Sequence, residues 1–283
     1  MGKTGYAIAP VVFGGIINTS ENQADANRYV AHAVERGVNY YDVAPVYGDA
    51  EERLGAALEP YRKNAFLACK TMRRDAEGAK EDLFESLRRL RTDYLDVYQL
   101  HAIQRDSDLE VAFAPNGAME TLVWAKKEGI VRKLGITAHS EEHALRCLDL
   151  YDFDTVLFTM YWVPGVLRGI GDKLAAVTKA RNIGLLCMKV LTHRVWREGE
   201  AKPADARQWY KYVEFGSQLA LTTLKYCLSK GAALVPPGNF AAFCYMLDNI
   251  DEAIANPISE RDMAFLRDEA EKIKDYELPL IGI

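Results

Sequence analysis

The chain lacks a long hydrophobic run. Its 283 residues contain no stretch of about 18 apolar residues, so a helix that crosses a membrane is not expected. The first residues also lack a charged region followed by an apolar one, which argues against a secretory signal. We therefore expect a soluble protein of the cytoplasm with no membrane partner.

Paired cysteines are absent as well. The five cysteines lie far apart, form no Cys-x-x-Cys pair, and are odd in number, so they cannot all be joined in disulfides. Several of them fall within apolar segments. The pattern predicts reduced, buried thiols in an intracellular protein and gives no support to a cysteine-based zinc site.

Positive charge is in deficit. Lysine and arginine number 35 against 40 aspartate and glutamate residues, which gives a net charge of −5. The one arginine cluster, formed by Arg88, Arg89 and Arg91, is flanked by acidic residues and is typical of a solvated helix face. Because nucleic-acid binding relies on excess positive charge, a nucleic-acid partner is not expected.

What the chain does have is a regular alternation of short apolar runs with amphipathic stretches. Runs of this kind are typical of parallel strands separated by crossover helices. Eight strands are predicted, at residues 11–13, 38–42, 65–70, 95–100, 133–137, 155–159, 184–189 and 233–236.

Start and stop signals mark several of the predicted helices. Ser20 and Gln23 have capping-box spacing, and Gly37 is suited to the left-handed conformation at the end of that helix. Ser259 and Asp262 have the same spacing beyond the eighth strand. The latter pair predicts an additional C-terminal helix on the outside of the fold.

Eight strand and helix units of this length predict an α/β fold, a (β/α)₈ TIM barrel of about 250 residues plus insertions. A doubly wound sheet is the rival fold, but it usually has a GxGxxG turn after the first strand, and here only Phe13-Gly14-Gly15-Ile16 follows. No linker divides the chain, so residues 1–283 are predicted to form one domain. The polar segment 192–208 is predicted to be a long loop after the seventh strand.

Polar residues stand where predicted strands two, three and four end. These are Asp42, Lys70 and His101, and Tyr47 follows Asp42 in a loop bent by proline and glycine. Active sites of TIM barrels lie at the carboxyl ends of the strands. We therefore expect these four side chains to share one mouth, although each taken alone could be a cap, a surface residue or a core residue.

Together these side chains are suited to delivering a proton to a developing alkoxide. A tyrosine hydroxyl is a weak acid at neutral pH, and the positive charge of Lys70 is predicted to lower its pKa. Asp42 would keep Lys70 charged, and a neutral His101 would orient a carbonyl oxygen. None of these groups can supply a hydride, so a redox cofactor is required.

Three segments, VNYYDVAPVYGDAEERLGAAL, FLACKT and DYLDVYQLHAI, closely resemble the aldo-keto reductase family. The resemblance implies a (β/α)₈ barrel that uses NAD(P)H to reduce the carbonyl groups of small aldehydes and ketones, or runs the reverse oxidation. It also implies that Asp42, Tyr47, Lys70 and His101 form the catalytic tetrad. Tyr47 would be the general acid and base.

The resemblance further implies a set of cofactor contacts spread over the barrel mouth. They are Gly14, Gly15, Ile16, Asp42, Thr137, His139, Thr159, Met188, Gly238, Asn239, Asp248 and Asn249. Some depart from the family pattern. Thr137 and Ala138 replace a Ser-Asn pair that grips the nicotinamide amide, Thr159 stands for a glutamine, and Met188 replaces an aromatic residue that stacks on the ring.

The phosphate-binding end departs further. Family members that prefer NADPH carry Lys and Arg near the loop that includes Gly238, but residues 231–250 contain neither. The resemblance by itself implies NADP(H). The missing positive charge makes NAD(H) possible as well, because the 2′-phosphate of NADP(H) is bound best by paired cations. The sequence leaves the oligomeric state open.

Two other classes of protein stay open. One is a regulatory barrel that binds a nucleotide as a sensor with little or no turnover, which the altered nicotinamide and phosphate loops favour. The other is a metal-dependent hydrolase or lyase that uses His101 and His139. No HxH or HExxH spacing supports the metal-dependent class, and no metal ligands are predicted.

Overall fold

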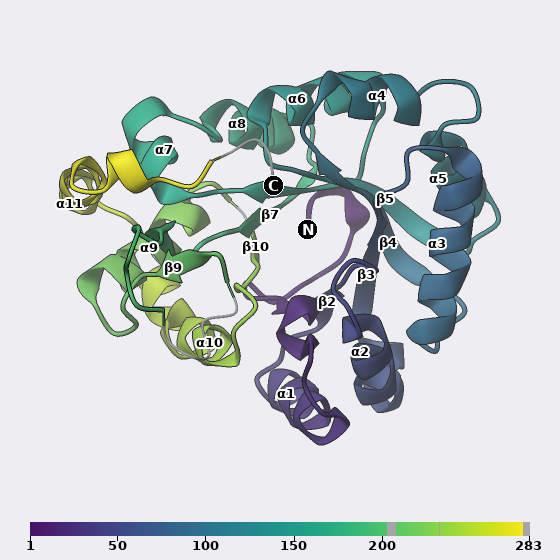
Figure 1. The fold of residues 1–283 in the computed structure, drawn as a ribbon, viewed down its shortest axis with the longest axis horizontal. Coiled ribbons are helices and arrows are strands. Elements are labelled where there is room, and N and C mark those ends of the chain that lie inside the picture. The colour runs from purple at the N-terminus through teal and green to yellow at the C-terminus, as the bar shows by residue number, and fades with distance from the viewer. Residues whose placement is uncertain (203–207, 232, 280–283) are drawn as a thin grey trace.

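The computed structural model describes residues 1–202, 208–231 and 233–279 (Figure 1). Its centre is a sheet of eight parallel strands in the order β1-β2-β3-β4-β5-β6-β7-β10. Their bounds are β1 Phe13–Gly14, β2 Tyr40–Asp42, β3 Phe66–Thr71, β4 Leu95–Ile103, β5 Val131–Ala138, β6 Thr155–Thr159, β7 Gly184–Met188 and β10 Ala233–Leu234.

The sheet closes into a barrel between its first and last strands. The Val12 N–H donates to the carbonyl of Leu234 at 3.0 Å, and the Leu234 N–H donates to the carbonyl of Pro10 at 2.8 Å. Closure of this kind removes the free edges of the sheet. The predicted (β/α)₈ barrel is confirmed, and each of the eight predicted strand positions carries a strand.

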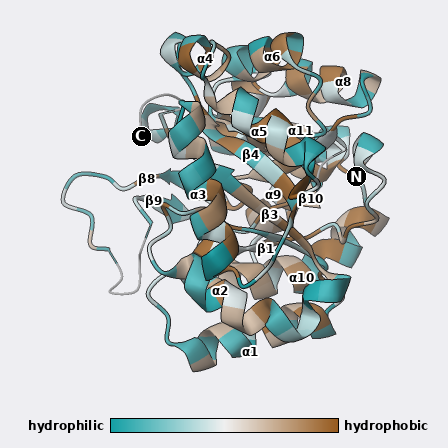
Figure 2. Ribbon diagram, turned by 90° about the vertical axis from the view of Figure 1, so that its right-hand side faces the viewer, coloured by the Kyte–Doolittle hydropathy of each residue, from teal (hydrophilic) through white to brown (hydrophobic). Residues whose placement is uncertain are grey.

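Eleven α-helices lie in the described part of the chain, most of them around the barrel. Their bounds are α1 Gln23–Glu35, α2 Ala50–Leu58, α3 Ala76–Arg89, α4 Asp106–Ala112, α5 Ala118–Lys127, α6 Glu141–Leu150, α7 Trp162–Arg168, α8 Asp172–Ala180, α9 Gln218–Ser229, α10 Phe240–Ala255 and α11 Glu260–Glu271. Figure 2 shows the hydrophobic residues concentrated on the strands and on the helix faces turned toward them. None of these helices combines the length and apolar character that a membrane span needs.

The predicted C-terminal helix is α11, which packs against α7 and α9 on the outside of the barrel (Figure 1). Its capping box is formed as predicted. The Asp262 N–H donates to the Ser259 hydroxyl at 3.1 Å, and the Ser259 N–H donates to the Asp262 carboxylate at 3.0 Å. Two of the free N–H groups at the helix start are thereby satisfied.

The predicted start of the first helix was wrong by two residues. Asn22 caps α1 by accepting a hydrogen bond from the Asp25 N–H at 2.9 Å. Ser20 instead has a φ of 60°, and its N–H donates to the Asp49 carboxylate at 2.8 Å. A tertiary contact therefore overrides the local capping pattern. Gly37 follows the helix with a φ of 78°, as predicted.

The inside of the barrel is filled by apolar side chains. Its buried members are Val12, Tyr40, Ala68, Val97, Leu157, Leu186 and Val235. Near the amino ends of the strands the ring of Tyr6 stacks on Phe66, with centroids 4.2 Å apart. The N-terminal segment thus packs against that end of the barrel, and the carboxyl ends of the strands form the mouth where polar residues gather.

The predicted loop at residues 192–208 contains a strand. β8 (Thr192–Val195) pairs antiparallel with β9 (Tyr210–Tyr212), so the plain loop was a wrong prediction, and residues 203–207 lie outside the described part (Figure 2). Polar residues in this segment satisfy one another. Arg194 makes a two-pronged ion pair with Glu200 at 2.7 and 2.9 Å, and Lys211 donates to the same carboxylate at 2.9 Å.

Candidate active site

Two buried charges of opposite sign meet at the carboxyl ends of β2 and β3. The Lys70 ammonium donates to the Asp42 carboxylate and, at 3.0 Å, to the carbonyl of Val43. Gln99 on β4 donates to the second Asp42 oxygen at 2.8 Å. Lys70 is 0 % and Asp42 3 % exposed, so the pair is removed from solvent and both partners are hydrogen-bonded.

Tyr47 and His101 lie beside this pair. Their rings meet edge to face with centroids 5.9 Å apart, and the Lys70 Nζ atom lies 5.2 Å from the centre of the Tyr47 ring. The tyrosine comes from the loop after β2 and the histidine from the end of β4. The structure therefore brings together all four residues predicted for the tetrad.

Burial and charge act in opposite directions on these groups. Burial lowers the pKa of Lys70, but Asp42 and Tyr47 more than offset it, so the pKa lies above its ordinary value and the ammonium stays charged. Burial raises the pKa of Tyr47, and the opposing charge of Lys70 does not cancel this effect. The predicted lowering of the Tyr47 pKa is therefore wrong in direction, because desolvation of the phenolate outweighs the lysine.

His101 is held neutral, as predicted. Burial lowers its pKa well below the ordinary value, and the nearby charge of Lys70 lowers it further. Its Nδ1 atom is buried and has no hydrogen-bond partner in the described part of the chain. A neutral imidazole in this place is available to hydrogen-bond a ligand.

The backbone after His101 is strained and held by neighbours. Ala102 has a φ of 54°, and its N–H donates to the Thr137 hydroxyl at 2.7 Å. Arg74, which is paired with Asp108 at 3.0 Å, donates to the His101 carbonyl at 2.6 Å. The pairing of β4 with β5 is irregular in this stretch. Strained backbone at a site persists only when its surroundings fix it, so Thr137 and Arg74 position the histidine.

A cleft of about 80 Å³ opens next to the tetrad. Its lining comes from β1, β2, β6, β7 and β10 or the loops after them, and from the start of β9: Gly14, Ile16, Asp42, Tyr47, Leu157, Met188, Lys189, Gln208, Tyr210, Val235, Pro236, Pro237 and Gly238. Of the predicted cofactor contacts, Gly14, Ile16, Asp42, Met188 and Gly238 line this cleft. Lys189, Gln208 and Tyr210 also line it and were not among the predicted site residues.

Two glycines in the lining pack closely against other parts of the chain. A Cβ atom on Gly14 would lie 3.2 Å from the carbonyl oxygen of Pro236, and one on Gly238 would lie 2.5 Å from the Gln208 amide nitrogen. Gly15 has a different role. A Cβ there would lie 2.8 Å from the Cβ atom of Val43, so this glycine allows close packing behind the cleft.

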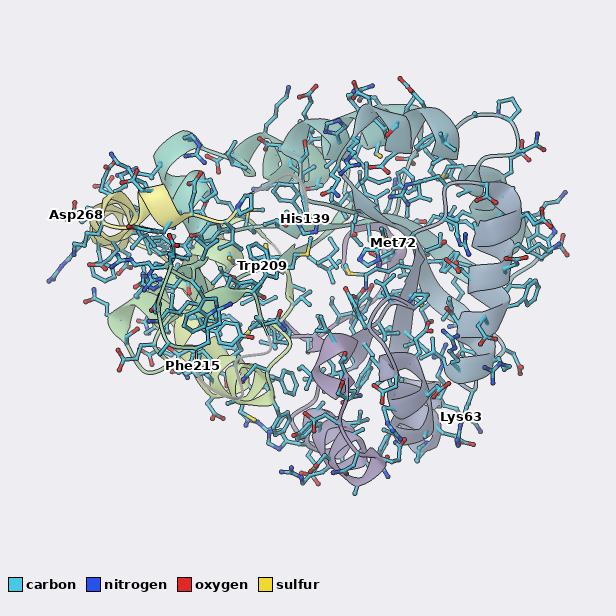
Figure 3. All side chains as sticks on the ribbon, in the orientation of Figure 1. Lys63, Met72, His139, Trp209, Phe215 and Asp268 are labelled. Carbon is cyan, nitrogen blue, oxygen red and sulfur yellow. The ribbon has the colours of Figure 1, made fainter. Side chains whose placement is uncertain are left out.

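On the β5 and β6 side, Thr137, His139 and Thr159 lie at the strand ends. His139 Nδ1 shares a hydrogen bond of 2.9 Å with the Thr159 hydroxyl, and burial lowers the His139 pKa to about 4. Leu157, two residues before Thr159 on the same face of β6, lines the cleft in its place. Figure 3 shows His139 near the middle of the barrel view, with Met72 and Trp209 on either side.

The remaining predicted contacts lie on or before α10. Asn239 caps this helix by accepting from the Ala242 N–H at 2.9 Å. Asp248 pairs with Arg36, the residue after α1, at 2.7 Å, and the Asn249 side chain donates to a carbonyl one turn back in its own helix. Neither Asp248 nor Asn249 lines the cleft. The positive charge beside α10 is therefore paired with a carboxylate of α10 itself.

A second cavity of about 310 Å³ continues past Gly238. It is lined by Ile17, Glu21, Tyr29, Tyr212, Gly238, Asn239, Phe240 and Ala241, a set without lysine or arginine in the part of the chain that the structure describes. The rings of Tyr29 and Phe240 stack there with centroids 3.9 Å apart. Sequence reasoning missed Tyr29, because nothing in the sequence shows that α1 lies next to the start of α10.

Among residues 1–202, 208–231 and 233–279, no group of three His, Cys, Asp or Glu side chains is arranged to hold a metal ion. The cysteines found there are free, and four of the five are buried. The geometry thus offers acid–base groups and a cleft but no metal cluster in the described residues.

Comparison with known proteins identifies the family. The sequence pattern of the Aldo/keto reductase family matches residues 10–235, which is most of the chain and includes all four tetrad positions. The chain belongs to the aldo/keto reductase family. It is therefore an oxidoreductase of the carbonyl and alcohol type.

Several relatives resemble this aldo/keto reductase over much of its length. L-galactose dehydrogenase of Arabidopsis thaliana is 27% identical over 247 residues, which cover 82% of this chain and 75% of the relative. Aldo-keto reductase str7 of Strobilurus tenacellus is 26% identical and covers 96% and 88%. The oxidoreductase YqkF of Bacillus subtilis is 32% identical over 153 residues, about half of each chain.

Solved aldo-keto reductases have the same fold. The holo form of aldo-keto reductase AKR11C1 from Bacillus halodurans superimposes with a TM-score of 0.71 at 21% identity, covering 96% of this chain and 94% of that one. The reductase from Brucella melitensis gives 0.68 at 16% identity, covering 95% and 97%. At such identity the match establishes the barrel, and the reaction has to be argued from the site.

Proposed function

We propose that this aldo/keto reductase uses NAD(P)H to reduce the carbonyl group of a small-molecule substrate to an alcohol, or catalyses the reverse oxidation, with Tyr47 as general acid and base. The observation that carries this proposal is the contact of the Tyr47 ring with Lys70 and His101, beside a cleft that Tyr47 and Asp42 line. The three side chains come from three consecutive strand and helix units of the barrel.

The states of the side chains fit this role. With its pKa raised by burial, Tyr47 holds its hydroxyl proton at neutral pH and can donate it to the substrate oxygen as that oxygen gains charge. The Lys70 ammonium then stabilises the phenolate, and Asp42 and Gln99 fix the ammonium. The neutral His101 orients the carbonyl oxygen by a hydrogen bond.

The residues around the cleft fit a nicotinamide cofactor. Met188 and Leu157 offer apolar surface to a flat ring, and Gly14 and Gly238 place no side chain on the cleft wall. When bound, the cofactor supplies the hydride that the protein side chains lack. The Thr137 hydroxyl oxygen accepts a hydrogen bond from the Ala102 N–H. The hydroxyl proton of Thr137 can then donate to the nicotinamide amide, which would lie near His139 and Thr159.

The second cavity favours NADH over NADPH. We assign the adenosine to the Tyr29 and Phe240 stack rather than to Asp248 and Asn249, because the stack lines the cavity and the other two do not. Glu21 lines the same cavity, and none of the described lining residues is basic. The Arg28 guanidinium lies 5.0 Å from the centre of the Tyr29 ring, but it is paired with Asp25 at 2.6 Å. A 2′-phosphate in the cavity would therefore meet the Glu21 carboxylate and no basic residue of the described lining. Calorimetric titration with both nucleotides tests this preference.

Turnover tests the reaction itself. The wild-type protein should oxidise NADH or NADPH in the presence of an aldehyde panel, and Tyr47→Phe should lower kcat by about a thousandfold with little change in nucleotide Kd. Tyr276→Phe is the matched control, since that tyrosine is 38% exposed and far from the tetrad in sequence. Equal kcat values for Tyr47→Phe and wild type would overturn the role of Tyr47.

One observation favours the nucleotide sensor as a second candidate. Gln208 and Tyr210 line the cleft with Tyr47, and the volume of about 80 Å³ leaves little room for a substrate beside a nicotinamide ring. A site that binds a nucleotide without a carbonyl substrate would suit a protein that reports nucleotide levels. Tight nucleotide binding without turnover of any aldehyde would support the sensor over the reductase.

A further inference from the structure

Lys189 is a second lysine at the mouth of the barrel that the proposed reaction does not use. It directly follows β7 and lines the cleft together with Tyr47 and Asp42. Its backbone has a φ of 67°, a conformation that lysine rarely adopts. Unusual backbone of this kind is concentrated at functional sites, so this position invites a functional explanation.

Aromatic rings surround the Lys189 ammonium. Its Nζ atom lies 4.3 Å from the centre of the Tyr210 ring and 5.4 Å from that of Trp209. Tyr210 is the first residue of β9 and lines the cleft, and Trp209 directly precedes it. Contacts between a cation and aromatic faces are favourable, but they do not neutralise the charge.

No carboxylate in the described part of the chain forms an ion pair with Lys189. Asp42 shares the cleft, but its two oxygens accept from Lys70 and Gln99. His139, the residue after β5, is near enough for its pKa to be lowered by the charge of Lys189 as well as by burial. The cleft therefore holds a lysine whose positive charge is balanced by none of the described neighbours.

A half-buried ammonium without a counter-ion is unfavourable. Burial lowers the pKa of Lys189 to about 8, which still leaves most of the group charged at neutral pH. An anion placed next to it would gain from the low polarity of the surroundings. A lysine in this state is suited to receive the negative group of a ligand and poorly suited to a purely structural role.

We propose that Lys189 is the anion-binding residue of this cleft and receives an oxyanion of the bound ligand. The inference rests on the proposed function for the site as a whole. The oxyanion has two possible sources with the same chemistry: a phosphate of the dinucleotide, or a carboxylate carried by the carbonyl substrate. The second source would make oxo acids the preferred substrate class.

Binding measurements on the full-length protein test the proposal. Lys189→Met keeps the length of the side chain and removes its charge, and Lys189→Arg keeps the charge. Lys173→Met is the control, because Lys173 is exposed on α8. Calorimetry would use NADH and inorganic diphosphate as phosphate probes, and γ-hydroxybutyrate with its methyl ester as the carboxylate pair. Thermal melting reports whether each variant is folded, and Lys189→Gln replaces Lys189→Met if the latter is not.

The neutral variant should raise Kd at least tenfold for one class of probe. A rise for NADH and diphosphate assigns the phosphate. A rise for γ-hydroxybutyrate, with its methyl ester unchanged, assigns the substrate carboxylate. Lys189→Arg and Lys173→Met should stay within about threefold of wild type.

The proposal is overturned if the wild type binds none of these anions, or if the folded neutral variant binds all of them as the wild type does. Neither result depends on turnover. Failure of the wild type to reduce any aldehyde would instead count against the proposed function, so the two failures are distinguishable.

Discussion

The two sides of the barrel mouth are built differently. On the β2 to β4 side, the charged groups Asp42 and Lys70 are buried and paired, and Gln99 adds a further hydrogen bond. On the β7 to β10 side, aromatic rings, prolines and glycines line the space, and Lys189 has no ion-pair partner in the described part of the chain. One side is electrostatically complete without a ligand, and the other is not.

This difference separates chemistry from recognition. A network that is already paired needs no rearrangement when charge develops on a substrate, which is how preorganised sites lower a barrier. A surface with an unbalanced charge and open apolar walls gains its partner only when a ligand binds. Substitutions on the first side should therefore change kcat and stability, and those on the second side should change affinity and ligand choice.

The largest effect is expected for Lys70→Met on the paired side. Asp42 would stay buried without its cation, so the free energy of unfolding should fall by about 3 kcal/mol, and kcat should fall by about a thousandfold. Chemical denaturation and steady-state kinetics measure the two effects. Lys63→Met is the control, since Lys63 lies exposed at the periphery of the view in Figure 3. Unchanged stability would show that the pair is not the buried unit described above.

A change of nucleotide preference is expected for Phe240→Lys on the recognition side. The new ammonium would enter the cavity that Phe240 lines and pair with a 2′-phosphate, so the ratio of the NADPH and NADH affinities should shift toward NADPH by about thirtyfold. Titration with both nucleotides measures the ratio. Phe84→Lys, at a position 47% exposed, should leave it unchanged. If Phe240→Lys has the same ratio of NADPH and NADH affinities as wild type, the adenosine does not bind in this cavity.

Anion affinity should depend on pH through Lys189. The titratable groups facing it are His139, Tyr210, Tyr47 and Asp42. His139 has a pKa of about 4, and burial raises the pKa of Tyr210 and of Tyr47. The pKa of Lys189 is about 8, so its charge is present below that pH and lost above it. Anion Kd should rise by about tenfold between pH 7 and 9. A flat profile over this range would argue against Lys189 as the receptor.

The smallest effect is expected for Thr137→Val. The Ala102 N–H would lose its acceptor, so the free energy of unfolding of the ligand-free protein should fall by about 1 kcal/mol, and kcat should fall by about fivefold as His101 loses its fixed position. Thr137→Ser keeps the hydroxyl and should restore both values. Measuring stability without nucleotide separates this positioning role from any contact with the cofactor.

The proximity of Asp42, Tyr47, Lys70 and His101 could be predicted from the sequence because each stands at the end of an apolar run or just after it. In a barrel, that local pattern is enough to place the side chains at one mouth. Ser259 and Asp262 were predictable for a similar reason, since a capping box depends on residues three apart. Gly37 needed only the rule that glycine readily adopts positive φ.

Predictions that depended on surroundings fared worse. The pKa of Tyr47 rises where a drop was predicted, because burial of the ring is a property of the assembled mouth. The helix start at Ser20 was wrong, because the Ser20 N–H donates to the carboxylate of Asp49, which belongs to another part of the barrel. The strand β8 was missed, because the pairing of Arg194 with Glu200 makes a polar segment compatible with a folded hairpin.

The amino-acid sequence by itself determined the eight-fold alternation of strands and helices, and with it the positions of Asp42, Lys70 and His101 at strand ends, since these follow from local periodicity. Only the tertiary structure decided which partners they meet. It placed Tyr29 against Phe240, and Tyr210 over Lys189, by packing segments that lie far apart in the chain. Burial, and hence the pKa of each group, arises from that packing and from no local pattern.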